Sequence, residues 1–385
     1  MKGYKLATDT WDDEEFKAIK RVIDSNRFTC SSEVELFENE FANYFNSNHA
    51  TMVNSGSSAN LIAIASLIYS ENYDLNVGDE VIVPAVSWAT TYTVLYQHGL
   101  KLRFVDIDLD TFNLNLDEVE KAITDKTRAI FAVNLLGNPN DFERLLEICE
   151  KHELILIEDN CESMGAKYHD RYTGTFGVLG TFSTFYSHHM ATMEGGMVLT
   201  ADSELNDIMK SIRSHGWTRG LSSTSLYEAH EDEFYEMFNF ILPGYNVRPV
   251  EMEAAIGREQ LKKLDVFLEN RKENGKYFTE LFSQIESLHI QKNVDDSSFF
   301  GFPIIFENER KRQKCVDLFR KHDIECRPIV AGNFTKNQVI NYFDYSIFGN
   351  LENANILHKQ GLFIGNHHYD VKESIDEIFD LITNL

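Results

Sequence analysis

The chain has 385 residues, enough for two domains or one large domain with an appendage, and a chain of this length buries roughly 75% of its surface on folding. With 36 Lys and Arg against 61 Asp and Glu, its net charge of −25 repels nucleic acid phosphates and anionic lipid headgroups, which argues against both as partners. Its five cysteines are far apart, with no CxxC pair, so we expect no structural zinc or other metal site, no disulfides and no iron–sulfur cluster.

The amino-terminal stretch MKGYKLATDTWDDEEF lacks the apolar run of a signal peptide. No segment of the chain approaches the roughly 20 consecutive apolar residues that span a bilayer. We therefore expect a soluble cytoplasmic protein that does not associate with membranes.

From about residue 50 to residue 200, short apolar runs alternate with helical stretches. The predicted strands cover residues 80–86, 102–108, 129–137 and 154–160. Nearly continuous apolar runs are typical of strands that are covered on both faces, so they predict an α/β fold with a mainly parallel sheet flanked by helices. Ligands of such sheets bind beyond the carboxyl ends of the strands, and we expect the functional site there.

The pattern changes near residue 250. A long linking helix is predicted by small and apolar residues at helical spacing, Val250, Ala254, Gly257, Leu261 and Leu264. Apolar runs at residues 299–306 and 324–330 then suggest a smaller α/β domain. We expect a large domain over residues 30–250 and a small carboxyl-terminal domain over residues 251–385, with residues 1–29 packing near the small one.

Four short segments could contribute to one site, and the first is a glycine-serine turn. In VNSGSSANL, Gly56 and Ser57 precede an apolar helix. Backbone N–H groups, hydroxyls and the positive end of the helix dipole at such a turn suit a phosphate group. The same residues would also satisfy an ordinary helix N-cap.

The other three segments each offer one polar or aromatic side chain. Asp159 follows an apolar strand, where its carboxylate could pair with a protonated ring nitrogen or cap the next helix. Trp88 follows the strand that ends near Pro84, where its indole could stack on a planar cofactor or simply pack. Ser183, in GTFSTFYSHHMATMEGG, is a second candidate phosphate ligand.

The order of these segments resembles that of fold-type I pyridoxal phosphate enzymes. Together with GYNVRPVEMEAAIG, they are similar over nearly the whole chain to the DegT/DnrJ/EryC/StrS family, the aminotransferases and dehydratases of nucleotide-linked ketosugars. The resemblance implies an aspartate aminotransferase-like fold. It also implies pyridoxal 5'-phosphate (PLP) or its amine form, pyridoxamine 5'-phosphate, as cofactor.

In aminotransferases of this family, a lysine seven residues before the glycine pair forms a Schiff base with the cofactor. Here that position is His188, and no lysine lies between Lys167 and Lys210. Imidazole forms no stable Schiff base but exchanges protons near neutral pH, since its unperturbed pKa is about 6.5. His188 is therefore expected to act as an acid/base beside a noncovalent cofactor. The alternatives are an aminotransferase that recruits a distant lysine and a noncatalytic homologue that only binds the cofactor.

The neighbouring His189 is expected to have a structural role. On an extended backbone, successive side chains point to opposite faces, so if His188 enters the site, His189 points away from it.

Within the family, a histidine at this position marks dehydratases that remove the 3-hydroxyl of a 4-ketosugar. One branch uses an iron–sulfur cluster, and without grouped cysteines this chain is similar to the cluster-free branch. The resemblance implies GDP-4-keto-6-deoxy-D-mannose as substrate and L-glutamate as amine donor. The products would be 2-oxoglutarate, ammonia and a ketosugar on the way to a 3,6-dideoxysugar such as colitose.

The resemblance also implies roles for four further residues. Glu162 would lie beside the cofactor ring near its hydroxyl, although many family members have Gln or His there. Asn246, in GYNVRP, would reach across a homodimer interface to the cofactor phosphate, so that the active sites are shared. Trp217 and Arg219, in SHGWTRG, are candidates for holding the nucleotide diphosphate, which arginine binds in a bidentate manner, although a loop arginine is usually just solvated.

Overall fold

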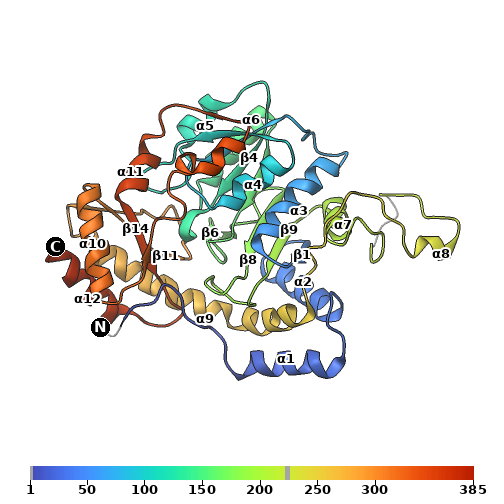
Figure 1. Cartoon of the computed structure of the whole chain (residues 1–385), viewed down its shortest axis with the longest axis horizontal. Coiled ribbons are helices and arrows are strands. Elements are labelled where there is room, and N and C mark those ends of the chain that lie inside the picture. Colours follow the sequence, from blue (N-terminus) through green and yellow to red (C-terminus); the bar gives the residue numbers. More distant parts are fainter. Residues whose placement is uncertain (1–2, 222–225) are drawn as a thin grey trace.

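The computed structural model describes residues 3–221 and 226–385 (Figure 1). At its centre is an eight-stranded sheet in the order β1-β9-β8-β5-β4-β2-β3-β13. Its strands are β1 (His49–Val53), β2 (Glu80–Pro84), β3 (Lys101–Val105), β4 (Thr127–Val133), β5 (Ile155–Asp159), β8 (Leu179–Ser183), β9 (Gly196–Thr200) and β13 (Tyr345–Ile347). Pairing is parallel from β8 through to β13, and antiparallel where β9 joins β8 and β1. The predicted mainly parallel sheet is confirmed, and β2 to β5 are the four predicted strands.

Helices cover both faces of this sheet, which explains why its central strands are largely apolar. Val81 and Val83 belong to the core shared with α3 (Gly56–Tyr69), α4 (Ala89–Gln97) and α7 (Ser203–Ile212). Ile82, between them, belongs to the core shared with α5 (Leu116–Ala122) and α6 (Phe142–His152). Alternate residues of one strand therefore bury their side chains on opposite faces.

A second sheet has four antiparallel strands in the order β10-β11-β14-β12 and its own apolar core. Its strands are β10 (Leu288–Ile290), β11 (Gly301–Phe306), β12 (Cys326–Arg327) and β14 (Gly361–Gly365). The helices of this half are α10 (Glu309–Lys321), α11 (Glu352–Gln360) and α12 (Lys372–Thr383), with 3-10 turns at Phe334–Lys336 and Gln338–Tyr342. Although β13 also comes from this half of the chain, it pairs with β3 in the large sheet. The domain boundaries at residues 30 and 250 stay predictions.

The predicted linking helix is confirmed as α9 (Glu251–Phe282), which runs below the large sheet to the small one (Figure 1). The amino-terminal helix α1 (Asp13–Ser25) and α2 (Ser32–Tyr44) both pack against α9. Ahead of α1, the Tyr4 hydroxyl donates to the carbonyl of Gly365 in β14 at 2.9 Å. None of the helices in the described part of the chain combines the length and apolar character needed to cross a membrane.

Between α7 and α9 the chain leaves the body as an arm, residues 214–246, which is described except for residues 222–225 (Figure 1). The two sides of the arm meet in isolated bridges between Ser214 and Asn246 and between Trp217 and Phe240. The short helix α8 (Glu233–Glu236) lies far out along it. The remaining elements are a 3-10 turn at Leu135–Gly137 and the hairpin of β6 (Lys167–Tyr168) and β7 (Arg171–Tyr172).

Candidate active site

His188 lies on a loop that joins β8 to β9, residues 184–195, which we call the histidine loop. The base of the loop is closed by a hydrogen bond from the Thr184 N–H to the Gly195 carbonyl at 3.0 Å. The hydroxyls of Thr184 and Thr192 lie 2.5 Å apart and tie its two sides together. The loop therefore starts and ends at the edge of the sheet where the parallel strands end.

The ring of His188 is oriented by the backbone of Cys161. Nδ1 of His188 lies 2.8 Å from the Cys161 carbonyl oxygen. Because a carbonyl only accepts, Nδ1 carries the proton, and Nε2 keeps its lone pair. Burial lowers the pKa of His188 to about 4; the Cys161 carbonyl partly opposes this shift, and the charge of Arg271 adds to it. At neutral pH the imidazole is uncharged and can accept a proton at Nε2.

Asp159 ends β5 and is almost fully buried, with its carboxylate held by three donors. Its Oδ2 accepts from Asn60 Nδ2 at 2.9 Å and from Thr91 Oγ1 at 2.7 Å. Its Oδ1 accepts from the backbone N–H of Cys161 at 3.2 Å. Cys161 therefore joins Asp159 to His188, through its N–H on one side and its carbonyl on the other.

The glycine-serine turn lies against the end of β8. Gly56 begins α3, and a Cβ atom there would lie 2.7 Å from Ser183 Cβ and 3.1 Å from Cys161 Sγ. Only glycine permits this close approach. The N-cap is Ser55, whose hydroxyl accepts from the Ser58 N–H at 3.1 Å, while Ser57 is exposed. The turn thus has a conventional cap and also presents the first N–H groups of a helix beside Ser183.

Glu162 and Trp88 complete this group. Glu162 Oε2 accepts from the Leu136 N–H at 3.1 Å. Burial raises the pKa of Glu162 to about 7, with the Leu136 N–H opposing the shift and the charge of Asp159 adding to it. Trp88 immediately precedes α4, and at 59% exposure its indole is free to receive a planar partner. It is one turn away from Thr91, which binds Asp159.

Three predicted site residues lie on the arm instead. The Trp217 indole N–H donates to the Met237 carbonyl at 2.9 Å, and the guanidinium carbon of Arg219 lies 5.2 Å from the centre of the Trp217 ring. Asn246 is exposed at the base of the arm. The next residue, Val247, accepts from the Asn54 N–H at 3.1 Å, which brings this base close to the glycine-serine turn. Within one chain Trp217 and Arg219 contact the arm, whereas Asn246 lies near the glycine-serine turn. The roles of all three residues stay predictions.

The expectation of an extended backbone at His189 is wrong. Residues 186–190 form a turn and bends, and the His188 N–H donates to the Phe185 carbonyl at 2.9 Å. Both rings lie against Phe300, but their ring nitrogens face different backbone carbonyls. His189 is fully buried, and its Nε2 lies 3.2 Å from the Ser298 carbonyl oxygen.

Sequence reasoning missed the residues that hold the predicted ones in place. Asn60 is four residues after Gly56 and therefore lies on the same face of α3. Thr91 is in the first turn of the helix that Trp88 precedes. These spacings were visible in the sequence, but their common partner Asp159 is far away in the chain. The carbonyl of Cys161 carried no sequence signal, since every residue has one.

Comparison with known proteins identifies relatives of this chain. A model of the DegT/DnrJ/EryC1/StrS aminotransferase family matches residues 9–383. A GDP-4-keto-6-deoxy-D-mannose 3-dehydratase from Yersinia pseudotuberculosis is 50% identical over 99% of this chain and 98% of its own length. A crystal structure of GDP-4-keto-6-deoxymannose-3-dehydratase with a trapped PLP-glutamate geminal diamine has a TM-score of 0.96 at 48% identity, covering 99% of this chain and 100% of its own. A histidine-to-asparagine mutant of a protein of that name, with bound GDP-perosamine, gives the same values.

These similarities confirm the fold class expected from the sequence, the aspartate aminotransferase-like fold of fold-type I pyridoxal phosphate enzymes. The similarity extends over nearly the full length, as the quoted segments implied. This chain therefore belongs to the DegT/DnrJ/EryC1/StrS aminotransferase family.

Proposed function

We propose that this protein is a PLP-dependent 3-dehydratase that removes the C3 hydroxyl of GDP-4-keto-6-deoxy-D-mannose. L-Glutamate would serve as amine donor, and 2-oxoglutarate and ammonia would be released. The observation that carries the proposal is His188, which occupies the position of the family's lysine with Nε2 free to exchange a proton. Without a lysine at this position, the site cannot bind the cofactor covalently through it, but His188 provides a group that can exchange protons.

The residues around Cys161 fit the cofactor. The close contact of Gly56 with Ser183 leaves no room for a side chain and lines up helix N–H groups with a hydroxyl, which suits a phosphate. Asp159 is a buried acceptor for the ring nitrogen, Trp88 offers a face for the ring, and Glu162 would lie near the ring hydroxyl. When bound, the cofactor supplies an amine for the C4 ketone and an electron-withdrawing ring, which together acidify a C–H bond and weaken the bond to the C3 oxygen.

His188 would perform both proton transfers. The low pKa leaves its Nε2 unprotonated at neutral pH, ready to take the acidic proton. The same low pKa makes the resulting imidazolium a strong acid, which can donate its proton to the departing C3 oxygen. The hydrogen bond from Nδ1 to the Cys161 carbonyl keeps the ring in one orientation during both steps.

The choice of substrates is supported by the relatives. Two dehydratase structures, each 48% identical to this chain, hold a PLP-glutamate adduct and GDP-perosamine respectively. The overall reaction balances with these reactants alone, because the oxygen lost from C3 of the sugar equals the oxygen gained when glutamate becomes 2-oxoglutarate and ammonia.

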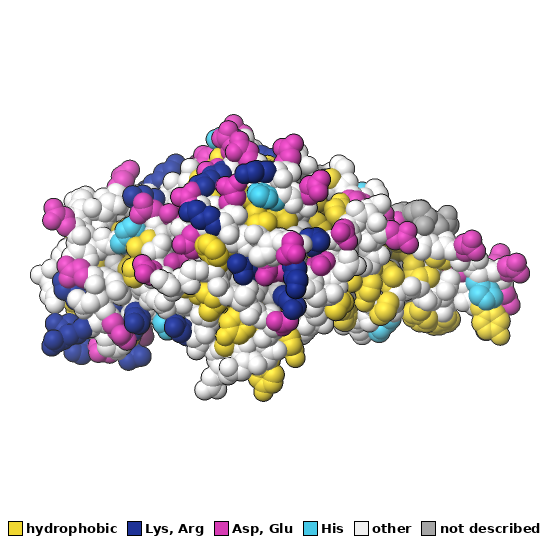
Figure 2. Space-filling view, turned by 90° about the horizontal axis from the view of Figure 1, so that it is seen from above, with side chains coloured by type: hydrophobic (Ala, Val, Ile, Leu, Met, Phe, Trp, Pro, Cys, Tyr) yellow, Lys and Arg dark blue, Asp and Glu magenta, His cyan; other side chains and the backbone are white. Residues whose placement is uncertain are grey.

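We also propose that the enzyme is a homodimer whose active sites are shared. The arm exposes a group of large apolar side chains, Phe234, Tyr235, Met237, Phe238 and Phe240. Figure 2 shows hydrophobic side chains gathered along this end of the molecule. A projecting apolar surface of this kind favours contact with another protein surface. A second copy of the chain would cover it and would bring Trp217, Arg219 and Asn246 to the partner's cofactor site.

The proposal is tested by incubating the purified protein with PLP, L-glutamate and either GDP-4-keto-6-deoxy-D-mannose or a dTDP-linked 4-ketosugar. We expect a ketosugar lighter by one oxygen atom, with one 2-oxoglutarate and one ammonia for each product molecule. An aminosugar without ammonia would instead identify an aminotransferase, and no turnover would identify a noncatalytic homologue. Borohydride reduction of the PLP-loaded protein should leave the cofactor removable, since no lysine stands at the anchoring position.

A further inference from the structure

The histidine loop is held from outside by two side chains that the proposed chemistry does not use. Ala191 is buried three residues after His188. Its backbone N–H donates to Gln260 Oε1 at 3.1 Å, and its carbonyl accepts from the indole N–H of Trp11 at 2.8 Å. Both backbone polar groups of Ala191 are therefore bound by side chains, one from α9 and one from the segment before α1.

Gln260 is fully buried, and its orientation is determined by its partners. Its Nε2 donates to Glu15 Oε1 at 2.7 Å and to the Thr10 carbonyl at 3.1 Å. Its Oε1 accepts from Thr10 Oγ1 at 2.7 Å as well as from Ala191. A carboxylate and a carbonyl can only accept, so the amide nitrogen of Gln260 must face Glu15 and its oxygen must face the loop.

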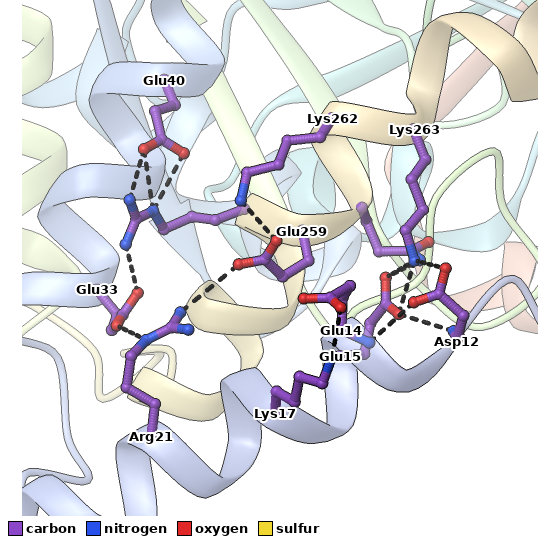
Figure 3. A network of polar contacts seen from close by, with 12 residues as sticks. Asp12, Glu14, Glu15, Lys17, Arg21, Glu33, Glu40, Glu259, Lys262 and Lys263 are labelled. Atoms are coloured by element: carbon purple, nitrogen blue, oxygen red, sulfur yellow. Dashed lines mark hydrogen bonds and ion pairs between the residues drawn. The ribbon is translucent and has the colours of Figure 1, made fainter.

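Glu15 is itself anchored between α1 and α9. Its carboxylate is completely buried and accepts from Lys263 Nζ at 2.7 and 2.8 Å and from the Asp12 N–H at 2.8 Å. Figure 3 shows Asp12, Glu15 and Lys263 converging in one cluster between the two helices. A buried carboxylate is tolerated only when it is paired and hydrogen-bonded, so this cluster resists displacement. The support of Ala191 therefore extends into the contact between two helices.

We propose that Gln260 and Trp11 are positioning residues for the proton transfers of His188. The inference rests on the proposed function. The Cys161 carbonyl orients the imidazole ring, and the two contacts at Ala191 hold the backbone that carries it. Gly56, Asp159 and Ser183 lie on α3, β5 and β8, outside the histidine loop. Loss of the Ala191 contacts should therefore misplace His188 and leave the cofactor contacts intact.

The test uses Trp11→Phe and Gln260→Leu in the full-length protein, with Arg258→Met as control. Trp11→Phe removes the indole N–H and keeps a smaller aromatic ring beside Phe16, so it remains informative if Gln260→Leu folds poorly. Arg258 lies on the same helix, two residues before Gln260, but its ion pairs at 2.8 Å join Glu33 and Glu40 at α2. The control therefore loses contacts of α9 without touching the histidine loop.

We expect kcat for dehydration to fall by about 10- to 100-fold in both test variants, because small displacements of a catalytic group have effects of this size. The Kd for PLP should stay within about twofold, since Gly56, Asp159 and Ser183 lie outside the loop, and the KM for the sugar should change less than kcat. Hydrogen exchange of residues 184–195 in the PLP-loaded protein should become faster. Arg258→Met should lower the melting temperature without changing kcat or this exchange.

Unchanged kcat in Trp11→Phe and in folded Gln260→Leu would overturn the inference. So would an equal loss of kcat in Arg258→Met when its loss of stability equals that of the test variants. If even the unsubstituted protein dehydrates no sugar, the proposed function fails. The hydrogen-exchange measurement then decides separately whether Gln260 and Trp11 hold the histidine loop. Unchanged exchange of residues 184–195 in both variants would show that they do not.

Discussion

At the scale of single residues, the replacement of lysine by His188 changes which chemical group the site offers. A lysine amine would form a covalent bond to the cofactor. The imidazole of His188 forms no such bond, and because its Nδ1 is hydrogen-bonded to the Cys161 carbonyl, only Nε2 is available for proton exchange. Burial keeps that nitrogen unprotonated, because the lowered pKa of about 4 lies well below neutral pH. The environment of His188 thus favours a base that becomes a strong acid once it is protonated.

This environment predicts a pH dependence of stability in the protein without cofactor. The unfolded pKa of His188 is about 6.5 and its folded pKa about 4, so between these values only the unfolded chain binds the proton. The free energy of unfolding should therefore fall as pH decreases through this window. In His188→Asn, urea titrations at pH 7 and pH 5 should show a smaller loss than in the unsubstituted protein.

Glu162 provides a control of opposite sign. Its pKa is raised from 4.5 to about 7, so between these values the folded chain holds the proton and stability is lost as pH rises. Glu162→Gln removes this contribution, and its stability loss between pH 7 and pH 5 should be larger than that of the unsubstituted protein. Identical pH dependence in all three proteins would show that neither group is perturbed as described.

At the scale of elements, the contact between α3 and β8 forms the proposed phosphate site. In Gly56→Ala the new Cβ would lie 2.7 Å from Ser183 Cβ, so the helix start or the strand end must move. We expect the Kd for PLP to rise at least tenfold, a loss of about 1.4 kcal/mol, measured by absorbance titration. The melting temperature should also fall, because an extra methyl group in a filled contact destabilises a protein by about 1–3 kcal/mol.

Ser183→Ala is the matched comparison for this prediction. It removes one hydroxyl without adding an atom, and its effect on PLP binding should be smaller than that of Gly56→Ala. Equal PLP affinity in Gly56→Ala and the unsubstituted protein would place the phosphate elsewhere.

Elements with a strong local pattern were predictable from the sequence. The apolar runs were sufficient to predict β2 to β5, because a strand buried on both faces needs apolar residues along its length. The helical spacing was sufficient to predict α9, because a helix buried along one stripe needs apolar residues at that spacing. The antiparallel strands β1 and β9 were missed, since their pairing with β8 is set by contacts far apart in the chain. The extended backbone assumed at His189 failed because the loop folds back on itself through Thr184 and Thr192.

The residues that touch the cofactor in the proposal were predictable, but those that support them were not. Asp159 comes at the end of an apolar strand, and His188 lies seven residues before the glycine pair, so both positions could be recognised in the sequence. Gln260 and Trp11 lie 69 and 180 residues from Ala191, and only the packing of α1 on α9 brings them there. A buried glutamine with four hydrogen bonds has no signature in a single sequence.

At the scale of the whole molecule, the arm carries large apolar side chains that a single chain does not cover. Phe234 and Phe238 are 69% and 67% exposed, respectively, and neither contributes to the cores of the two sheets. The double variant Phe234→Asp/Phe238→Asp should shift the protein from dimer to monomer in sedimentation velocity experiments, because charges at an apolar interface are costly to bury.

Val77→Asp serves as the control, since Val77 is 73% exposed on the body of the molecule. It should leave the dimer intact. A monomeric unsubstituted protein with full activity would refute the shared active sites. A double variant that remains dimeric would show that the interface lies elsewhere.

The central claim is that His188 moves the protons of the elimination and does not hold the cofactor. The most direct test compares His188→Asn with the unsubstituted protein, measuring the Kd for PLP and the rate of conversion of GDP-4-keto-6-deoxy-D-mannose in the same preparations. We expect PLP affinity within about threefold and a dehydration rate lower by roughly 10²- to 10⁴-fold, the range for loss of general acid–base catalysis. Equal dehydration rates in the two proteins would contradict the claim and assign the proton transfers to another group.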